Sequence, residues 1–234
     1  MRLVTRNCNR GSVETKLPLL ARFAPTLAIL PECSCPKTES ASSLWFGDPG
    51  RPGIAVNAAP GCRITPIAPR DVPRYTFPIQ VDGAVRFLLL VVWSKTDTDY
   101  RYVKAVVRAV ECYRDLITAQ PTVIIGDFNS NTIWDYKRPS DQNHSGLVRR
   151  LSALNMTSAY HSFYGEVHGE ETRPTLYLLK QQQRPYHIDY CFIPDAWLSS
   201  VRSVEVGRYE DWIKFSDHTP PCIDIDLPRG ARAG

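Results

Sequence analysis

The sequence lacks the marks of a membrane or secreted protein. No apolar run approaches the ~20 residues that span a bilayer, and the run FLLLVVW at residues 87–93 has the length of a core strand. The N-terminal segment MRLVTRNCN also lacks the apolar core of a signal peptide. We therefore expect a cytoplasmic protein.

Neither the cysteines nor the charge points to a binding partner. The seven cysteines are an odd number scattered among apolar neighbours, which indicates reduced, buried thiols. The CSC at residues 33–35 has no CxxC or spaced histidine pair to complete a zinc site, so zinc is not expected there. A net charge of +4 is compatible with a polyanionic partner but too small to indicate one.

What the sequence does contain is many short strands. Its 234 residues suit a single domain over 1–227, followed by a flexible tail at 228–234. Strand patterns occur at residues 1–7, 26–32, 43–47, 53–58, 62–68, 74–81, 85–93, 122–127, 174–179, 186–193, 201–206 and 220–227. About a dozen strands exceed one comfortable sheet, so two sheets packed face to face with helices outside are expected.

Helical spacing of apolar residues appears in two segments, 99–117 and 144–154. A third candidate helix, 12–23, begins at the capping residue Ser12, and Pro18 should kink or shorten it.

Polar side chains follow or interrupt several of the apolar strands. The residues are Asn7 and Asn9 after RLVT, Glu32 after LAIL, Asp127 and Asn129 after VIIG, Asp189 inside YHIDYCFI, and Asp217 and His218 before PPCIDIDL. Carboxylates are rarely left in an apolar strand unless they are paired, hydrogen-bonded or bound to a metal. Strand-end loops of two stacked sheets would share one rim, so these side chains are expected to meet there.

The segments NCN, LPE, GDFNSN, IDY and SDH occur in this order along nearly the whole chain. Together they resemble the endonuclease/exonuclease/phosphatase superfamily of DNase I-like and exonuclease III-like proteins, with GDFN and SDH as the strong motifs. The resemblance implies an α/β fold, a four-layer αββα sandwich of two mainly antiparallel sheets with helices outside. It also implies Mg²⁺-assisted hydrolysis of phosphate esters, with Mn²⁺ as the alternative metal.

Roles for the motif residues come from the resemblance. Glu32 takes the place of the main Mg²⁺ ligand and Asp217 completes the metal site, while Asn9 stands where some members carry a second metal-site acid, so one-metal chemistry is preferred. Asp127 would orient or deprotonate the attacking water, Asn129 would donate to a phosphate oxygen, and His218 would hydrogen-bond the phosphoryl group. Asp189 would hold His218 in the needed tautomer, and Asn7 would support the metal or the catalytic acid.

The sequence departs from the pattern of the superfamily at three places. Arg6 stands where an aromatic residue is usual, and Pro31 stands where a glutamine is usual. A histidine or tyrosine is usual after the middle long strand, where this chain has VVWSKTDTDYRY. Lys95 or Tyr100 is the candidate to replace it as a phosphate contact, and the choice between them stays open.

Beyond the motifs, NSNTIWD, NHSGLV and YHIDYCF are similar to a subgroup of bacterial members. Asn131, Trp134, Asp135, His144 and His187 are the candidates for the wall of the substrate pocket. For Trp134 simple packing of the ring is the stronger alternative, and for His187 a satisfied strand histidine is an equal one. His161 and His168 have the character of loop residues outside catalysis.

The substrate is the least determined part of the prediction. Dispersed arginines (Arg70, Arg74, Arg101, Arg138, Arg173, Arg184) and aromatic residues expected to be exposed (Trp45, Tyr164, Trp212) favour nucleic acid and a nuclease or phosphodiesterase. The alternatives are a phosphomonoesterase acting on an inositol phosphate or nucleotide-like molecule, and an inactive relative that only binds nucleic acid or a partner protein. The oligomeric state is left open.

Overall fold

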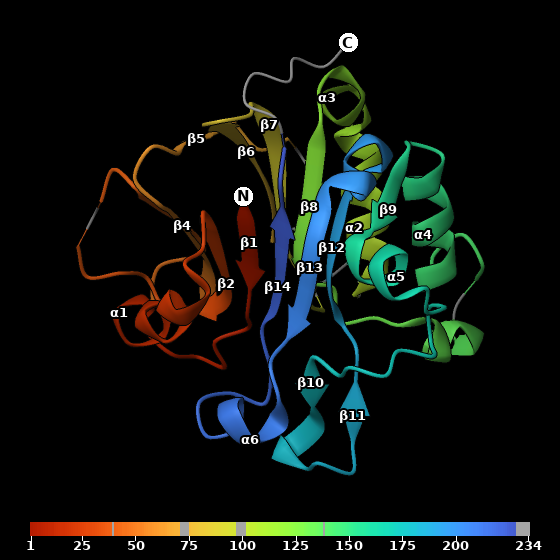
Figure 1. Cartoon of the computed structure of the whole chain (residues 1–234). Coiled ribbons are helices and arrows are strands. Elements are labelled where there is room, and N and C mark those ends of the chain that lie inside the picture. Colours follow the sequence, from red (N-terminus) through yellow and green to blue (C-terminus); the bar gives the residue numbers. More distant parts are fainter. Residues whose placement is uncertain (39, 71–74, 97–101, 138, 228–234) are drawn as a thin grey trace.

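A computed structural model describes residues 1–38, 40–70, 75–96, 102–137 and 139–227. The described residues form two six-stranded sheets that pack face to face, with helices on both outer sides (Figure 1). The predicted tail at 228–234 lies outside the described residues, as do residues 99–101 at the start of one predicted helix.

The first sheet has the strand order β13-β14-β1-β2-β4-β3. Its strands are β1 (Arg2–Thr5), β2 (Leu27–Cys33), β3 (Ser43–Phe46), β4 (Gly53–Ala58), β13 (Val201–Val206) and β14 (Pro221–Ile225). Strands β1 and β2 are parallel and the other neighbours are antiparallel.

The second sheet has the order β5-β6-β7-β8-β12-β9. Its strands are β5 (Arg63–Pro66), β6 (Thr76–Asp82), β7 (Phe87–Trp93), β8 (Thr122–Asp127), β9 (Met156–Ser158) and β12 (Asp189–Pro194). Only β7 and β8 run parallel among its neighbouring strands. A small hairpin of β10 (Leu176–Tyr177) and β11 (Pro185–Tyr186) lies apart from both sheets.

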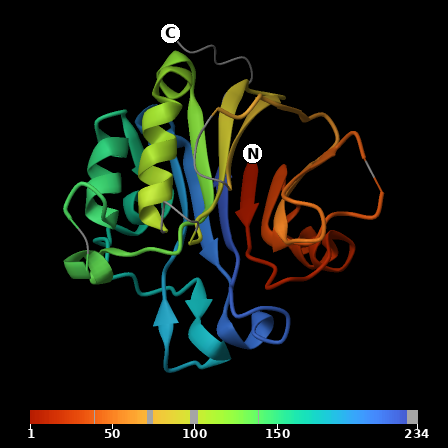
Figure 2. The ribbon, with the colours of Figure 1, turned by 180° about the vertical axis from the view of Figure 1, so that it is seen from behind.

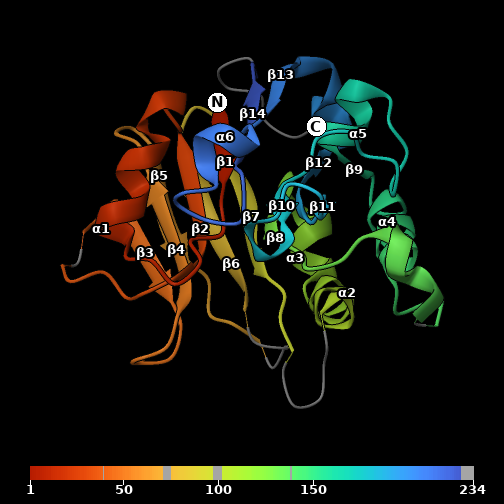
Figure 3. The same ribbon diagram turned by 90° about the horizontal axis from the view of Figure 1, so that it is seen from below.

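The helices cover the outer faces of the two sheets. Helix α1 (Val13–Lys16) and the 3₁₀ helix η1 (Leu17–Phe23) lie outside the first sheet, while α2 (Val103–Cys112), α3 (Arg114–Ala119) and α4 (His144–Ser152) lie outside the second (Figures 2 and 3). The remaining helices are η2 (Thr132–Lys137), α5 (Ala159–Tyr164), η3 (Leu178–Lys180), η4 (Asp195–Ser200) and α6 (Tyr209–Trp212). The expected αββα sandwich is therefore present.

Two of the expected helices differ in detail. The side chain of Ser12 accepts a hydrogen bond from the Thr15 amide and caps α1, and the chain changes to 3₁₀ geometry at Leu17, where Pro18 cannot donate to an α-helical ladder. The helix expected over 99–117 is divided at Tyr113, whose ψ of 11° is not helical. The ring of Tyr113 is fully buried, and its hydroxyl accepts the backbone N–H of Arg70.

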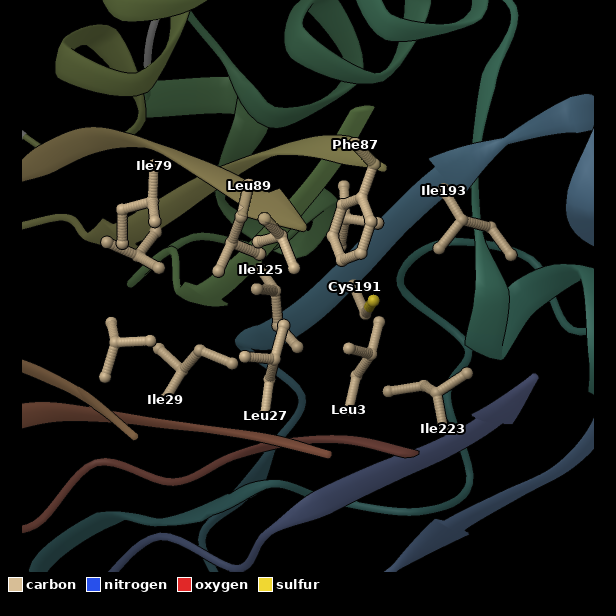
Figure 4. Close-up of a cluster of buried hydrophobic side chains, with 14 of the residues drawn as sticks. Leu3, Leu27, Ile29, Ile79, Phe87, Leu89, Ile125, Cys191, Ile193 and Ile223 are labelled. Carbon is tan, nitrogen blue, oxygen red and sulfur yellow. The ribbon is translucent and has the colours of Figure 1, made fainter. Parts of the chain in front are cut away.

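One hydrophobic cluster fills the space between the sheets and holds them together. Leu3, Leu27, Ile29 and Ile223 of the first sheet face Leu89, Ile125 and Ile193 of the second sheet (Figure 4). All of them are at most 2% exposed, which accounts for the β-branched and leucine-rich strands that the sequence contains. Two further clusters attach the helices to the outer faces of the two sheets.

All seven cysteines are free, but they are not all buried as expected. Cys35 is exposed, and Cys62 and Cys112 are partly exposed, because their segments lie at the edges of the molecule rather than in its core strands. Cys8 and Cys33 are buried, and the Cys33 thiol donates to the Cys8 sulfur at 2.7 Å. Among the described residues, no helix is long and apolar enough to cross a bilayer; the cytoplasmic location stays a prediction.

Candidate active site

The site begins where β8 ends, at the sequence Gly126-Asp127. Gly126 has φ +145°, and a Cβ there would lie 1.9 Å from the carbonyl oxygen of Val92 on β7. Only glycine avoids this clash, since the contact is with backbone that cannot move independently. The close approach of the two parallel strands brings Asp127 to the rim of the second sheet.

Asp127 is fully buried and held by three hydrogen bonds. Its Oδ2 accepts the side-chain amides of Asn7, at 2.9 Å, and Asn129, at 3.0 Å, while its Oδ1 accepts the backbone N–H of Asn129 at 2.9 Å. Burial raises the pKa of Asp127 to about 7, and the nearby Asp189 adds to this, against the opposing effects of His218 and Asn7. A carboxyl group with this pKa can accept a proton near neutral pH.

Glu32 is joined to Asp127 through Asn7. The Asn7 amide donates to Glu32 Oε2 at 3.2 Å as well as to Asp127, so one side chain connects the two sheets at the rim. Glu32 lies in a bulge of β2 between Pro31 and Cys33 and has φ +56°. The bulge turns its carboxylate toward the rim, where 23% of the side chain is exposed.

His218 and Asp189 form the second pair of the site. His218 Nδ1 lies 2.8 Å from Asp189 Oδ2, and both side chains are buried. Burial lowers the pKa of His218, but the attraction of Asp189, Asp127 and Asp217 outweighs it and raises that pKa to about 9. Ligand-type atoms of Asp127, Asp189 and His218 all lie within 4.8 Å of one another, so the two pairs form one cluster.

Asp217 and Asn9 lie at the open side of this cluster. The Asn9 amide donates to Asp217 Oδ1 at 3.1 Å, and the backbone N–H of Asn9 donates to Asn7 Oδ1 at 2.8 Å. The structure thus brings together all eight side chains predicted for catalysis and the metal: Asn7, Asn9, Glu32, Asp127, Asn129, Asp189, Asp217 and His218.

The position of Asn129 differs from its expected task as a phosphate donor. Both protons of its amide are engaged, one with the carbonyl oxygen of Ser94 at 2.8 Å and one with Asp127. Its φ of +46° places the backbone so that the side chain folds back onto Asp127. Asn129 therefore holds the Asp127 carboxylate in this structure.

A pocket of about 590 Å³ lies beside the cluster. Four of the five expected wall residues line it: Asn131, Trp134, Asp135 and His144. Asn129 of the cluster lines it as well. The rings of Trp134 and Tyr186 lie 5.1 Å apart with a 44° tilt and form its aromatic side. Asn131 is 2% exposed and its amide is used within the protein, donating to the His187 carbonyl oxygen at 2.9 Å.

Several other expected contacts are absent from the pocket wall or cannot be placed. His187 is 3% exposed, is not a lining residue and directs Nδ1 to the Arg173 carbonyl oxygen at 2.8 Å, so it is a satisfied buried histidine on that side. The Lys95 ammonium lies 3.8 Å from the centre of the Tyr75 ring, and Lys95 is also not a lining residue. Tyr100, Arg74, Arg101 and Arg138 lie outside the described residues.

The aromatic and basic residues expected to contact nucleic acid are largely engaged within the protein. Trp212, expected to be exposed, is 3% exposed because it packs in the cluster under the first sheet, where its ring stacks on Phe23 at 5.9 Å. Trp45 is half-buried against the same cluster. Arg70 is paired with Asp115, and Arg173 is paired with Glu166.

The structure shows how Arg6 is accommodated at a position where the superfamily usually has an aromatic residue. Its side chain is fully buried, and its guanidinium lies 4.8 Å from the centre of the Trp212 ring. Burial lowers its pKa, and its nitrogens have no hydrogen-bond partner among the described residues. The arginine therefore fills the space behind Asn7 by stacking on an aromatic ring.

Two hydroxyl groups that the sequence analysis did not single out position the site. Thr175 Oγ1 accepts the backbone N–H groups of Ile188 and Asp189, each at 3.0 Å. Ser216 Oγ donates to the Asn7 carbonyl oxygen at 2.9 Å and accepts the backbone N–H of His218 at 3.1 Å. Ser216 is the first residue of the SDH motif, which was a signal for it, whereas nothing near Thr175 marked that residue.

The residues at the open side fit a hard divalent cation. Glu32 Oε2 accepts one hydrogen bond from Asn7, and Oε1 faces only the exposed Arg10, at 3.5 Å, among the described residues. The Glu32 carboxylate thus keeps lone pairs directed to solvent. The carboxylate of Asp217, which is partly exposed, does the same. Carboxylate oxygens on a wet, open face are the ligands that Mg²⁺ takes while it retains several waters.

Solved structures share this fold over nearly the whole chain. The 3′ phosphatase NExo from Neisseria, bound to a product DNA hairpin, has a TM-score of 0.68 at 20% identity, covering 97% of this chain and 100% of its own. The endonuclease domain of TRAS1, a telomere-specific non-LTR retrotransposon, has a TM-score of 0.70 at 14% identity, covering 97% and 98%. An AP endonuclease from Archaeoglobus fulgidus has a TM-score of 0.66 at 14% identity, covering 97% and 100%.

No family model matches the sequence, and no curated protein matches it. The chain shares the fold of these three solved structures, and this is the fold that the motif resemblance led us to expect. At these identities the likeness concerns the fold, and the activity of the chain is argued from its own site.

Proposed function

We propose that the chain is a Mg²⁺-dependent phosphoesterase that hydrolyses nucleic acid by in-line attack of water on phosphorus. The observation that carries this proposal is the buried cluster in which Asn7 joins Glu32 to Asp127, and His218 pairs with Asp189 within 4.8 Å of Asp127. A proton acceptor, a cationic donor and a free carboxylate at one rim are the groups that phosphoryl transfer requires.

Asp127 is the proposed proton acceptor. Its Oδ1 receives one hydrogen bond, from the Asn129 backbone, and so keeps a lone pair for a proton of the attacking water. As the bond from the water oxygen to phosphorus forms and the bond to the leaving oxygen breaks, that proton passes to Asp127. Asn7 and Asn129 fix the direction of the carboxylate, which keeps the acceptor aligned without adding charge.

His218 is the proposed donor to the phosphoryl oxygens. Because Asp189 holds Nδ1 and keeps the imidazole protonated, the Nε2–H remains for a phosphoryl oxygen. Glu32 and Asp217, with Asn9 beside them, would hold one Mg²⁺ ion, or Mn²⁺ in its place. The bound ion would supply charge neutralisation to the phosphoryl group and the departing oxygen.

The pocket favours a nucleotide unit over a polyphosphate. Its wall combines Trp134 and Tyr186 with Leu176 and Ile188. Among its described lining residues Lys137 is the one lysine or arginine, and its ammonium lies 5.3 Å from the centre of the Tyr136 ring. Aromatic walls of this kind stack an unpaired base, whereas a cup for inositol phosphates needs clustered cations. The substrate is therefore proposed to be nucleic acid with one nucleotide in this pocket.

A phosphomonoesterase that removes a terminal phosphate from a nucleotide or a nucleic-acid end is the second candidate. The observation in its favour is that the pocket adjoins the cluster directly, with Asn129 belonging to both. An inactive binding relative is disfavoured, because binding alone gives no reason to keep Asp127 buried next to Asp189, with the repulsion that this pairing costs.

The test is a hydrolysis assay of the purified protein with Mg²⁺, with Mn²⁺ and with a chelator. The substrates are plain DNA, abasic-site DNA, RNA, 3′-phosphorylated DNA and inositol phosphates. Metal-dependent cleavage of a nucleic acid supports the first proposal, and release of phosphate without strand cleavage supports the second. Absence of turnover on every substrate, or turnover that the chelator leaves unchanged, would refute both.

A further inference from the structure

Four of the five histidines of the chain gather behind the loop that follows β8. His144 begins α4, His161 lies in α5, His168 follows α5, and His187 precedes β12. The ring centres of His161 and His168 are 3.5 Å apart with the rings stacked, and those of His144 and His168 are 5.3 Å apart. These residues come from segments far apart in the sequence, and the candidate active site uses none of them as a catalytic group.

The nitrogen atoms of this cluster are incompletely satisfied. His168 Nδ1, His144 Nε2 and His187 Nε2 are buried without a hydrogen-bond partner among the described residues. Burial lowers the pKa of His168 to about 3, helped by His161, so its ring is neutral and carries a lone pair. Buried polar atoms are normally paired, and several unpaired imidazole nitrogens in one place require an explanation.

A buried carboxylate completes the cluster. The Glu171 side chain is 4% exposed, and its Oε1 lies 3.1 Å from His161 Nε2. Burial raises the pKa of Glu171, but hydrogen bonds from His161 and Asn131 outweigh that and lower it to about 2. The charged form is thus kept in the interior, where a carboxylate is costly unless a cation lies beside it.

We propose that His161, His168 and Glu171 bind one divalent transition-metal ion, with Zn²⁺ as the best fit. Their ligand atoms all lie within 4.8 Å of one another, and rotation of the His168 ring out of its stack on His161 would let their lone pairs meet at the ~2.0–2.2 Å metal distances of such a site. Two imidazoles and one carboxylate with an open fourth position form a known zinc donor set. Mg²⁺ is disfavoured because imidazole is not among its preferred ligands.

The surroundings orient two of these three ligands, His161 and Glu171. His161 Nδ1 pairs with Ser158 Oγ at 2.8 Å, which leaves Nε2 for the metal, and Asn131 donates to both carboxylate oxygens of Glu171 at 3.1 and 3.0 Å. Such outer contacts fix the tautomer and direction of metal ligands. The ion would take the place of the contact between His161 Nε2 and Glu171 Oε1, with a proton on Nδ1 directed to Ser158 Oγ.

The proposed zinc site contains none of the catalytic residues, but it is connected to the loop after β8 that carries Asn129. It shares no residue with Asp127, Asp189 and His218. Through Asn131 it would fasten residues 168–171 to the loop that carries Asn129, which lines the substrate pocket. Its effect would therefore be to stiffen the pocket wall and to raise the stability of the folded chain.

Zinc binding is tested on the full chain after removal of metals with a chelator. Titration calorimetry with Zn²⁺ and metal analysis after desalting are compared for the wild type, His168→Gln and the control His218→Gln. We expect one Zn²⁺ per chain in the wild type and in the control, a higher thermal midpoint with Zn²⁺ in both, and affinity lower by at least ~10²-fold in His168→Gln. X-ray absorption spectra at the zinc edge of the wild type should show nitrogen and oxygen ligands at ~2.0–2.2 Å.

The variants also define the results that would overturn the proposal. Circular dichroism establishes that His168→Gln is folded, and Glu171→Gln serves as a second ligand variant should it not be. Equal Zn²⁺ binding by the wild type and by either folded ligand variant would refute the site. Loss of Zn²⁺ in His218→Gln with retention in His168→Gln would assign the ion to the catalytic cluster. Absence of Zn²⁺ binding by the wild type would refute the zinc site and leave His161 and Glu171 as a hydrogen-bonded pair.

Discussion

At the scale of single residues, Asp127 has the largest expected effect on turnover. Because burial disfavours its charged form, the neutral amide in Asp127→Asn should leave folding intact while it removes the proton acceptor. We expect turnover to fall by at least ~10²-fold on the substrate that the wild type hydrolyses. Asp141→Asn, which changes an exposed acid farther along the chain, is the matched control and should keep wild-type turnover. Near-normal hydrolysis by Asp127→Asn would remove Asp127 from this role.

His218 gives a residue-scale prediction that does not depend on activity. Its raised folded-state pKa, about 9 against an ordinary 6.5, means that its contribution to the free energy of unfolding is complete below pH 6.5 and is lost as pH rises through 9. Proton NMR of the metal-free protein should show one imidazole titrating near 9. In Asp189→Asn that pKa should fall, since the nearest anion is removed. A His218 pKa that Asp189→Asn leaves unchanged would contradict the assigned pairing.

The strand and loop elements of the site explain which residues could be read from the sequence. Gly126, Asp127 and Asn129 follow an apolar run, and this local pattern was enough to place them at a strand end. The engagement of both Asn129 amide protons depends on Ser94, which lies 35 residues earlier, directly after the neighbouring strand β7. Local spacing carries no information on such a contact, and for the same reason His161 and His168 had the character of separate loop residues.

The close contact between strands β8 and β7 can be tested by substituting Gly126. In Gly126→Ala the new Cβ would clash with the Val92 carbonyl oxygen, and the backbone would keep a φ that alanine rarely adopts. We expect the free energy of unfolding to fall by ~1–3 kcal/mol or more. Gly50→Ala is the matched control, because Gly50 also has a positive φ, +75°, but nothing lies within 4 Å of its Cβ position. Urea unfolding of both variants measures the difference. Equal losses would show that the contact with β7 is not what requires glycine.

At the scale of the whole molecule, two kinds of contact join the sheets. Hydrophobic side chains such as Leu27 and Ile125 fill the middle, and the number of apolar strand patterns in the sequence was enough to predict two packed sheets. At the rim the contacts are polar, from Asn7 to Asp127 and from His218 to Asp189. Which strands face each other there is decided by topology, so the sequence patterns alone indicated the polar residues, and the pairing of Asp189 with His218 was expected only from the family resemblance.

The metal should therefore stabilise the whole fold, because its proposed ligands exist as a set only when the chain is folded. Glu32 on β2 and Asp217 before β14 come from distant parts of the sequence, and Mg²⁺ binding to the native state alone raises the free energy of unfolding by about 2.7 kcal/mol at 100 times its dissociation constant. In the wild type, the thermal midpoint should rise with Mg²⁺ concentration. Glu32→Gln should abolish most of this rise, whereas the zinc-site variant His168→Gln should retain it, which separates the two metal proposals. An equal Mg²⁺ response in Glu32→Gln and the wild type would place the ion elsewhere.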